Sequence, residues 1–130
     1  MSEITVKRDR VVSRSFRASE FRCRCRRPDC DAVSIDKDFL VKLQALRDAW
    51  GLPFIITSGV RCAFWNTTIK GSTHSQHISG KAADIHLETP EHGPKIAALA
   101  EKIGMGGIGV GRVLIHVDSG PDGRRWTYDY

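Results

Sequence analysis

The sequence predicts a small α+β domain, in which helices pack on one side of a mainly antiparallel sheet. The chain has 130 residues, a length typical of one domain with its own hydrophobic core. Two segments carry apolar residues at helical spacing. Several shorter segments carry alternating or continuous apolar residues and are bounded by glycine or proline, as strands are.

The first expected element is a basic N-terminal arm, residues 1–18, ahead of a domain at residues 19–130. Residues 1–30 hold nine Lys or Arg and four Asp or Glu, so the whole net charge of +5 arises in this quarter of the chain. We expect the arm either to be solvated and partly disordered or to bind an anionic surface such as wall polymer or nucleic acid.

The first helix is expected over residues 34–51. Ser34 and Asp36 are both candidates for its N-cap, and Gly51 ends it. Its apolar stripe consists of Phe39, Leu40, Leu43, Leu46 and Trp50.

The second helix is expected over residues 89–104. Thr89 is its candidate cap, Pro90 stands at its first position and Gly104 ends it.

Five strands are expected in the rest of the chain. They cover residues 53–59, 81–88, 106–110, 112–120 and 124–130. The segment between the first two strands is rich in turn residues and has room for one helical turn, and the last strand is expected at an edge of the sheet.

Two of these strands each present an aspartate and a histidine opposite their aliphatic residues. Because side chains alternate along a strand, Asp84 and His86 share one face of their strand, and His116 and Asp118 share one face of theirs. If the two strands are neighbours, these four polar groups converge on one patch.

His77 completes a candidate metal-ligand set. It precedes Asp84 with Gly80 between them, so a loop that folds back at Gly80 brings His77 over the start of the strand. His77, Asp84 and His116 are two imidazoles and one carboxylate, the ligand set of a catalytic zinc site that leaves a fourth position open. From spacing alone, the alternative is an ordinary polar outer face of the sheet.

The four cysteines, Cys23, Cys25, Cys30 and Cys62, allow three interpretations. We expect reduced cysteines, because no secretory signal is visible. A second, structural zinc ion on all four is the alternative, although the sequence lacks the usual C-x2-C spacing. A disulfide between Cys62 and one of the others is the third, if the protein ends outside the cell.

Three separated motifs resemble the zinc D-alanyl-D-alanine metallopeptidases, whose fold is hedgehog-like. They are SQHISGKAAD at residues 75–84, ITSGVRC at residues 56–62 and GGIGVGRVLIHVDSGPDGRRW at residues 106–126. The early FRCRCRRPDC is similar to the opening of phage and prophage members. The resemblance covers residues 19–130, and the family includes D-Ala-D-Ala carboxypeptidases and phage L-alanyl-D-glutamate endolysins.

The resemblance implies a role for each matching residue. His77, Asp84 and His116 would hold one catalytic Zn²⁺. Ser75 would contact the substrate, and Arg61 would face the scissile carbonyl or the substrate carboxylate, where a guanidinium stabilises developing negative charge.

The general base departs from the family pattern. Many members carry an acid three residues before the last zinc histidine, where this chain has Val113. Asp118 is the nearest substitute, or else an acceptor that orients His116. His86 is the other candidate for proton transfer.

These implications predict a zinc peptidase, of carboxypeptidase or murein endopeptidase type, that cleaves a peptidoglycan bond involving a D-amino acid in a phage or prophage cell-wall hydrolase. The rival is a non-catalytic zinc-binding module of the same fold. A third interpretation makes the cysteines and the arm a nucleic-acid-binding element, but we do not expect nucleic acid as a partner.

Localisation follows from two absences in the sequence. No apolar run is long enough to span a membrane, and the first sixteen residues lack the apolar core of a signal peptide. We therefore expect a monomer made in the cytoplasm that acts in the periplasm or at the cell wall after release, or else in the cytosol. Its expected partners are peptidoglycan peptides and, through the arm, an anionic envelope polymer.

Overall fold

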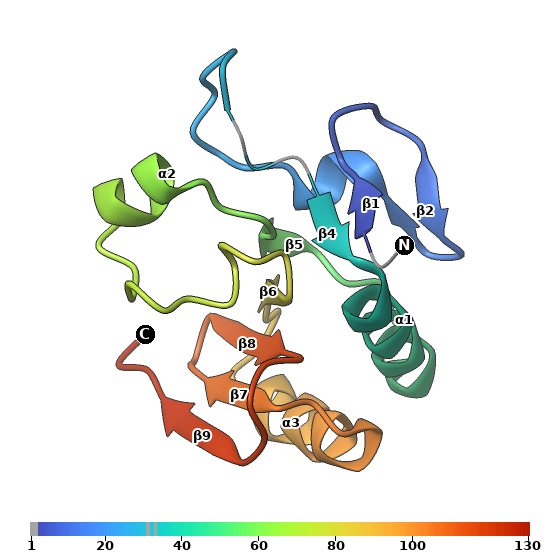
Figure 1. Cartoon of the computed structure of the whole chain (residues 1–130). Helices are drawn as coiled ribbons and strands as arrows, with labels where there is room; N and C mark the ends of the chain where they lie inside the picture. The colour runs from blue at the N-terminus through green and yellow to red at the C-terminus, as the bar shows by residue number, and fades with distance from the viewer. Residues whose placement is uncertain (1–2, 31, 33) are drawn as a thin grey trace.

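The structure is a computed structural model that describes residues 3–30, 32 and 34–130. It has an α+β fold, which confirms the predicted class (Figure 1). The strands are β1 (Glu3–Thr5), β2 (Val11–Ser13), β3 (Phe16–Arg17), β4 (Ser34–Asp36), β5 (Ile56–Ser58), β6 (Ala82–His86), β7 (Gly107–Val110), β8 (Leu114–Asp118) and β9 (Arg124–Thr127). The helices are the 3-10 helix η1 (Ala18–Phe21) and the α-helices α1 (Lys37–Trp50), α2 (Ala63–Thr68) and α3 (His92–Ile103).

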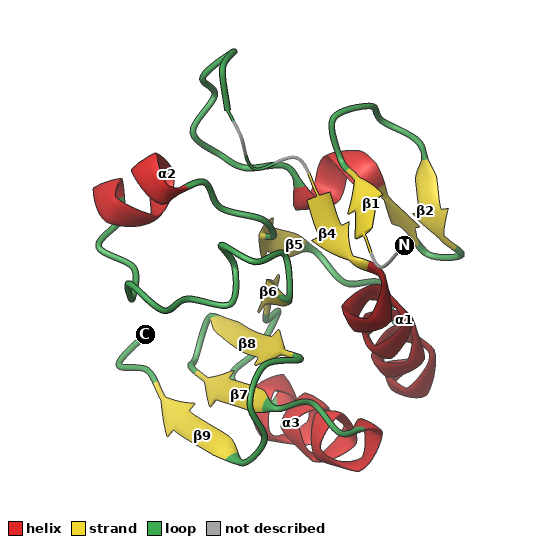
Figure 2. Cartoon of the chain, in the orientation of Figure 1, coloured by secondary structure: helices red, strands yellow, loops and turns green. Residues whose placement is uncertain are grey.

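The main sheet has five strands in the order β5-β6-β8-β7-β9. All neighbours are antiparallel except β7 and β9, which run parallel, so the sheet is mainly antiparallel as predicted. β9 lies at the edge, also as predicted, while β5 is shorter than the expected strand 53–59. Two small antiparallel pairs, β1 with β4 and β2 with β3, lie beside this sheet (Figure 2).

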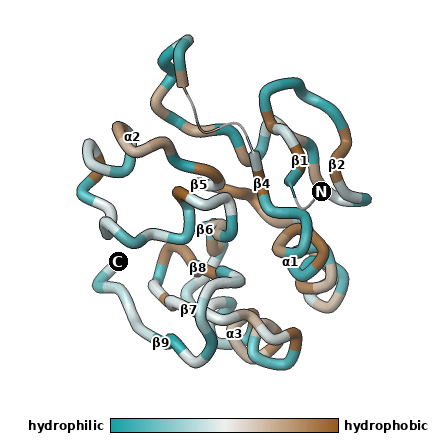
Figure 3. Tube along the Cα trace, viewed as in Figure 1, coloured by the Kyte–Doolittle hydropathy of each residue, from teal (hydrophilic) through white to brown (hydrophobic). Residues whose placement is uncertain are grey.

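Helix α1 forms where the apolar stripe predicts it. The Asp36 carboxylate accepts a hydrogen bond from the backbone N–H of Phe39 at 2.9 Å, which settles the choice between the two cap candidates. Gly51 ends the helix with a left-handed φ of 84°. Hydrophobic and hydrophilic residues alternate around α1 in Figure 3. Phe39, Leu40, Leu43 and Leu46 are buried in the core, and the helix packs against α3 and β4.

Helix α3 begins at His92, two residues after the predicted first position, Pro90. Thr89 and Pro90 form a turn, in which the N–H of His92 donates to the Thr89 carbonyl at 3.2 Å, so Thr89 is not the helix cap. Pro94 then falls in the first helical turn, where its missing N–H costs nothing. The helix ends at Gly104 as predicted.

Residues 3–18 do not stand apart as an arm. Ile4 pairs with Ile35 across β1 and β4, and Val6 and Phe16 are buried in the core. In the sequence, the many charged residues of this segment obscure its short apolar runs. In the structure the charged residues lie at exposed positions, such as Arg8 and Arg10. Residues 1–2 of the expected arm lie outside the described residues.

The core lies between the main sheet and α1 and α3. The sheet contributes Ala83, Ile85, Ile115 and Val117, which are the aliphatic positions that strand alternation predicts, while Val113 precedes β8 and is 51% exposed. None of the helices in the described part of the chain combines the length and the apolar character that a membrane crossing needs.

Candidate metal centre

Strands β6 and β8 are neighbours, so the polar faces predicted for them meet. In their antiparallel register Asp84 lies opposite His116 and Ala82 lies opposite Asp118. Directly opposite residues of a sheet place their side chains on the same face within contact distance. The Asp84 carboxylate and the His116 Nδ1 are 3.0 Å apart.

His77 reaches the same carboxylate from the loop before β6. Its Nε2 lies 3.2 Å from Asp84 Oδ1, and its Nδ1 donates to the Gly59 carbonyl at 2.6 Å, which leaves Nε2 as the free ring nitrogen. The fold-back depends on Gly80, which has φ of 72°. A side chain there would also come within 2.5 Å of the Ser34 carbonyl, so the turn needs glycine.

The donor atoms of His77, Asp84 and His116 fit a zinc ion. One nitrogen or oxygen from each lies within 4.8 Å of the others, and all three residues are buried. The two contacts of Asp84 Oδ1, at 3.2 and 3.0 Å, are close to the separation of about 3.3 Å expected between ligands of a tetrahedral zinc ion. The structure therefore brings together all three predicted ligands.

Burial and mutual contact shift the ionisation of His77 and Asp84. Burial lowers the pKa of His77 and so favours the neutral imidazole that metal ligation requires. Burial opposes the ionised form of Asp84, but the adjacent His116 and His77 rings outweigh it and hold the pKa of this carboxyl well below its usual range. The carboxylate is thus charged at neutral pH and able to accept a cation.

Asp118 fixes the orientation of the His116 ring. Its Oδ2 accepts a hydrogen bond from His116 Nε2 at 2.7 Å, so Nδ1 is the nitrogen turned toward Asp84. The other oxygen accepts from the backbone N–H of Gly120 at 2.9 Å and from the guanidinium of Arg124. The residue is fully buried, and this geometry is that of an acceptor that orients a metal ligand.

Arg61 connects four polypeptide segments around the site. Its Nη2 donates to Asp84 Oδ2 at 3.2 Å, and its Nε donates to Ser58 Oγ at 3.1 Å. Its Nη1 contacts Asn66 Oδ1 at 3.3 Å and Ser75 Oγ at 3.5 Å. The fork of donors is therefore fixed beside the candidate ligands, at the place where the motif resemblance implies an active-site arginine.

These residues line a cavity of about 790 Å³. Its wall includes Arg61, Ser75, His77, Asp84, His116 and Asp118, together with cationic and aromatic side chains: Lys70, Arg124, Arg125, Trp126, Tyr128 and Tyr130. The cavity belongs to the size range of small-molecule and peptide sites. His74 also reaches this wall from the exposed loop.

The aromatic part of the wall was not predicted from the sequence as a unit. Trp126, Tyr128 and Tyr130 alternate along the C-terminal segment, so strand periodicity would have placed them on one face. The Trp126 ring lies 5.1 Å from the His116 ring, centre to centre. The missing information was the position of this edge strand beside β7.

His86 is not part of the site, contrary to the sequence-based prediction. Its ring lines a separate, small cavity with Trp50 and Leu52, and its Nε2 lies 4.0 Å from Glu88 Oε1. It shares the face of Asp84, as alternation requires, but the cavity reaches Asp84 in the middle of β6 and not His86 at the end of the strand. Two residues on the same face of β6 therefore lie at two different cavities.

Comparison with known proteins gives a match to a protein family. A family model described as Peptidase M15 matches residues 14–118, which is most of the chain. No curated protein matches it. The matched residues contain His77, Asp84 and His116, as well as Arg61 and Asp118.

Proposed function

The chain belongs to the peptidase M15 family, and we propose that it is a zinc metallopeptidase that hydrolyses a peptide bond in the stem peptides of peptidoglycan. The observation that carries this proposal is the convergence of His77, Asp84 and His116 on one buried point at the wall of a large cavity. A zinc ion held there supplies Lewis acidity and activates water at neutral pH.

Arg61 is the residue proposed to stabilise negative charge on the scissile carbonyl. Its guanidinium is held by Ser58, Asn66 and Asp84, so its orientation is fixed before a substrate arrives. Donors that are already oriented need no reorganisation during the reaction. Ser75, whose hydroxyl lies beside Arg61 Nη1, is proposed to contact the substrate backbone.

The wall of the cavity supports a substrate that carries carboxylates. Lys70, Arg124 and Arg125 provide positive charge, although Arg124 is already paired with Asp118. Stem peptides contain free carboxylates and D-amino acids, and the choice of a D-amino-acid bond comes from the motif resemblance. A phage or prophage cell-wall hydrolase is the setting that we propose.

Proton transfer needs an acid or base close to the candidate ligands. Among the described residues lining the cavity, the carboxylates are Asp84 and Asp118. Asp84 is a proposed ligand, and Asp118 is fully buried behind His116. We propose that Asp118 acts on the reaction through His116 as a positioning residue.

A second candidate function is a non-catalytic zinc-binding module. Val113 stands where many family members have an acid, and its side chain points to solvent with 51% of its surface exposed. This observation favours a chain that binds the ion without cleaving peptides. The two functions differ only in turnover, so an activity measurement separates them.

The experiment is the digestion of purified peptidoglycan, with the released fragments identified by mass. We expect stem-peptide fragments that disappear with a chelator and return with Zn²⁺. Arg61→Lys should lower kcat by about 100-fold or more, because the lysine cannot reproduce the fork of donors. The matched control is Arg8→Lys. Arg8 is exposed and lies far from Arg61 in the sequence. Zinc binding without any released fragment would establish the non-catalytic module instead.

A further inference from the structure

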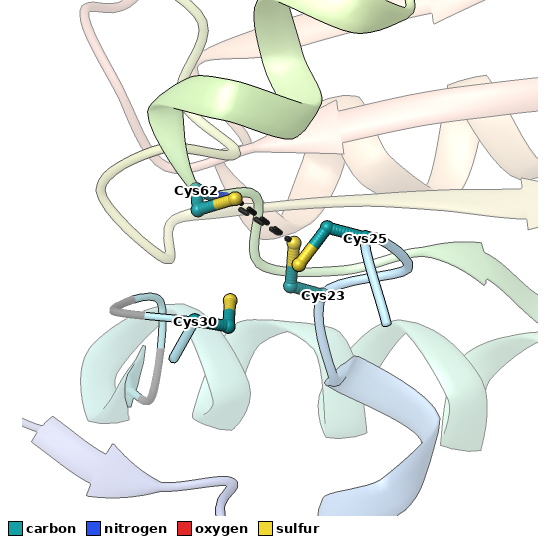
Figure 4. Close-up of side chains that lie close together, drawn as sticks. All are labelled: Cys23, Cys25, Cys30 and Cys62. Atoms are coloured by element: carbon teal, nitrogen blue, oxygen red, sulfur yellow. Dashed lines mark hydrogen bonds between the residues drawn. The ribbon is translucent and has the colours of Figure 1, made fainter. Parts of the chain in front are cut away.

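A second cluster of metal-binding groups lies outside the cavity. Cys23, Cys25 and Cys30 stand in the loop between η1 and β4, and Cys62 immediately precedes α2. The four Sγ atoms all lie within 4.8 Å of one another. Figure 4 shows the four sulfur atoms turned toward one space between these segments. A chain separation of 39 residues between Cys23 and Cys62 is thus closed by the fold.

The sulfur spacing fits a shared metal ion. The Sγ atoms of Cys23 and Cys62 are 3.6 Å apart, and all four cysteines are free. A disulfide requires about 2.05 Å between its sulfurs. Four thiolates around a zinc ion, at about 2.3 Å from the metal, are about 3.8 Å from one another. The observed distance is therefore close to the edge of a zinc tetrahedron.

Backbone N–H groups point at three of the four sulfurs. The N–H of Cys62 donates to Cys23 Sγ at 3.3 Å, and that of Trp65 donates to Cys62 Sγ at 3.3 Å. The N–H of Arg27 donates to Cys25 Sγ at 3.4 Å. Hydrogen bonds to the charged form of an acid stabilise that form, and outer-shell donors of this kind support metal ligands.

The surrounding charge is positive. Four thiolates and one divalent ion leave a net charge of about −2, which needs compensation in a half-buried place. Arg22, Arg26 and Arg27 line the cavity of about 310 Å³ that contains Cys23, Cys25 and Cys30. The Arg27 guanidinium lies over the Phe64 ring, 4.1 Å from its centre, and is thereby fixed near α2.

We propose that Cys23, Cys25, Cys30 and Cys62 bind one structural zinc ion. Four soft thiolate ligands select zinc among the common divalent ions, and a closed four-ligand set is that of a structural site rather than a catalytic one. The C-x-C spacing at Cys23 is unusual, but the fold, not the sequence spacing, supplies the tetrahedral arrangement.

The ion has a defined structural effect. The loop that carries three of the cysteines contains no regular secondary structure between η1 and β4 among its described residues. Binding of the proposed zinc ion links this loop to Cys62. Cys62 directly follows Arg61, and the Arg61 side chain contacts Asp84. The proposed zinc therefore anchors the backbone that positions Arg61.

The test is the number of zinc ions per full-length chain, measured by native mass spectrometry of reduced protein. We expect two ions in the unaltered chain and one in His77→Ala. We also expect one in the double variant Cys25→Ser/Cys30→Ser. Because this double variant can fail to fold, a second measurement leaves the cysteines unchanged. In it, Co²⁺ replaces zinc in the unaltered chain and in the His77→Ala variant. Both should show the intense thiolate-to-cobalt absorption that histidine and carboxylate ligands do not give.

Three outcomes would overturn the proposal. One is a single zinc ion in the unaltered chain that is lost in His77→Ala. Another is a cobalt derivative without thiolate absorption. The last is a mass, before reduction and under zinc saturation, that shows Cys62 in a disulfide. None of these results depends on hydrolytic activity, so the proposed peptidase function and this site succeed or fail separately.

Discussion

Asp84 is the residue on which the candidate metal centre depends most. One buried carboxylate contacts His77, His116 and Arg61, which come from three separate segments. A buried charge is tolerated only when it is paired and hydrogen-bonded, and these three side chains are the partners of the Asp84 carboxylate. The same contacts also place the donor atoms at metal-ligand spacing.

Asp118 tests whether ring orientation controls metal affinity. Asp118→Asn keeps the size of the side chain but weakens acceptance from His116 Nε2 and removes the ion pair with Arg124. We expect zinc affinity at the His77 site to fall by about 10- to 100-fold. A zinc titration followed by the imidazole NMR signals measures it, with the exposed Asp122→Asn as the control. Equal affinities in the two variants would show that Asp118 does not orient His116.

The pKa of Asp9 leads to a prediction of how acid changes the stability of the fold. Hydrogen bonds from the side chain and backbone of Ser19, together with the Arg17 guanidinium, lower the pKa of Asp9. A carboxyl whose pKa is lowered by folding stabilises the fold above its unfolded pKa, and this contribution is lost as pH falls through the folded pKa. It is therefore present at neutral pH and disappears below the ordinary value of 3.8.

The measurement is the denaturation midpoint of the unaltered chain and Asp9→Asn as a function of pH. We expect Asp9→Asn to be the less stable protein at neutral pH and the difference to vanish in acid. Asp129→Asn, at an exposed position near the C-terminus, serves as the control. A difference that stays constant across the acid range would mean that ionisation of Asp9 has no part in stability.

At the scale of elements, the register between β6 and β8 creates the site. Asp84 lies opposite His116, and a slip of one residue would turn the side chains of one strand over, so that Asp84 and His116 would lie on opposite faces of the sheet. Strand β7 packs against the other side of β8, and its glycines make room for neighbouring side chains. At Gly109 an added Cβ would lie 2.3 Å from the Trp126 indole.

Gly107→Ala tests this close packing. A Cβ at Gly107 would lie 2.3 Å from Asp118 Oδ2, and Asp118 is fully buried and cannot move aside freely. Overpacking of this kind costs about 1–3 kcal/mol in the free energy of unfolding, and displacement of Asp118 should also weaken zinc binding. Chemical denaturation and a zinc titration measure both effects.

The control for this substitution is Thr127→Ala, at an exposed position on β9, which should change stability by no more than about 0.5 kcal/mol. If Gly107→Ala matched the control in both measurements, the contact between β7 and Asp118 would not support the site.

The elements that are predicted correctly from the sequence are those with a strong periodicity of apolar residues. Helix α1 and strands β6 and β8 carry clear apolar patterns, and two of the proposed ligands, Asp84 and His116, follow from the faces of the two strands. His77 follows from the turn at Gly80. The start of α3 was misplaced, because Thr89 and Pro90 satisfy the rules for a helix start while in fact forming a turn. His86 was misassigned because periodicity identifies a face but not where a cavity ends along it.

At the scale of the whole molecule, the cavity is built from distant parts of the chain. Arg61 and the loop at residues 69–77 form one wall, and β9 with the C-terminal tyrosines forms another. Only tertiary structure places Tyr128 and Tyr130 near the candidate ligands, so the sequence pattern could not assign them. The order of strands in the sheet, with β9 beside β7, was the missing information.

Removal of residues 1–18 distinguishes an arm from a part of the domain. The truncation deletes the buried side chains of Val6 and Phe16 and leaves β4 without its partner β1. Each lost apolar side chain contributes about 1.5–3 kcal/mol, so we expect a clear fall in the denaturation midpoint.

The control is Arg8→Gln/Arg10→Gln, which removes positive charge at exposed positions and should leave stability unchanged. Binding of both variants to purified sacculi at several salt concentrations tests the anionic envelope partner. A truncated chain of undiminished stability that loses only this binding would restore the interpretation of a separate arm.

The most direct test of the account is a crystal structure of the full chain grown with Zn²⁺, with diffraction recorded on both sides of the zinc absorption edge. We predict an anomalous peak in contact with His77 Nε2, His116 Nδ1 and an Asp84 carboxylate oxygen. The absence of a peak among these three side chains, at zinc concentrations that fill other sites in the same crystal, would contradict the account.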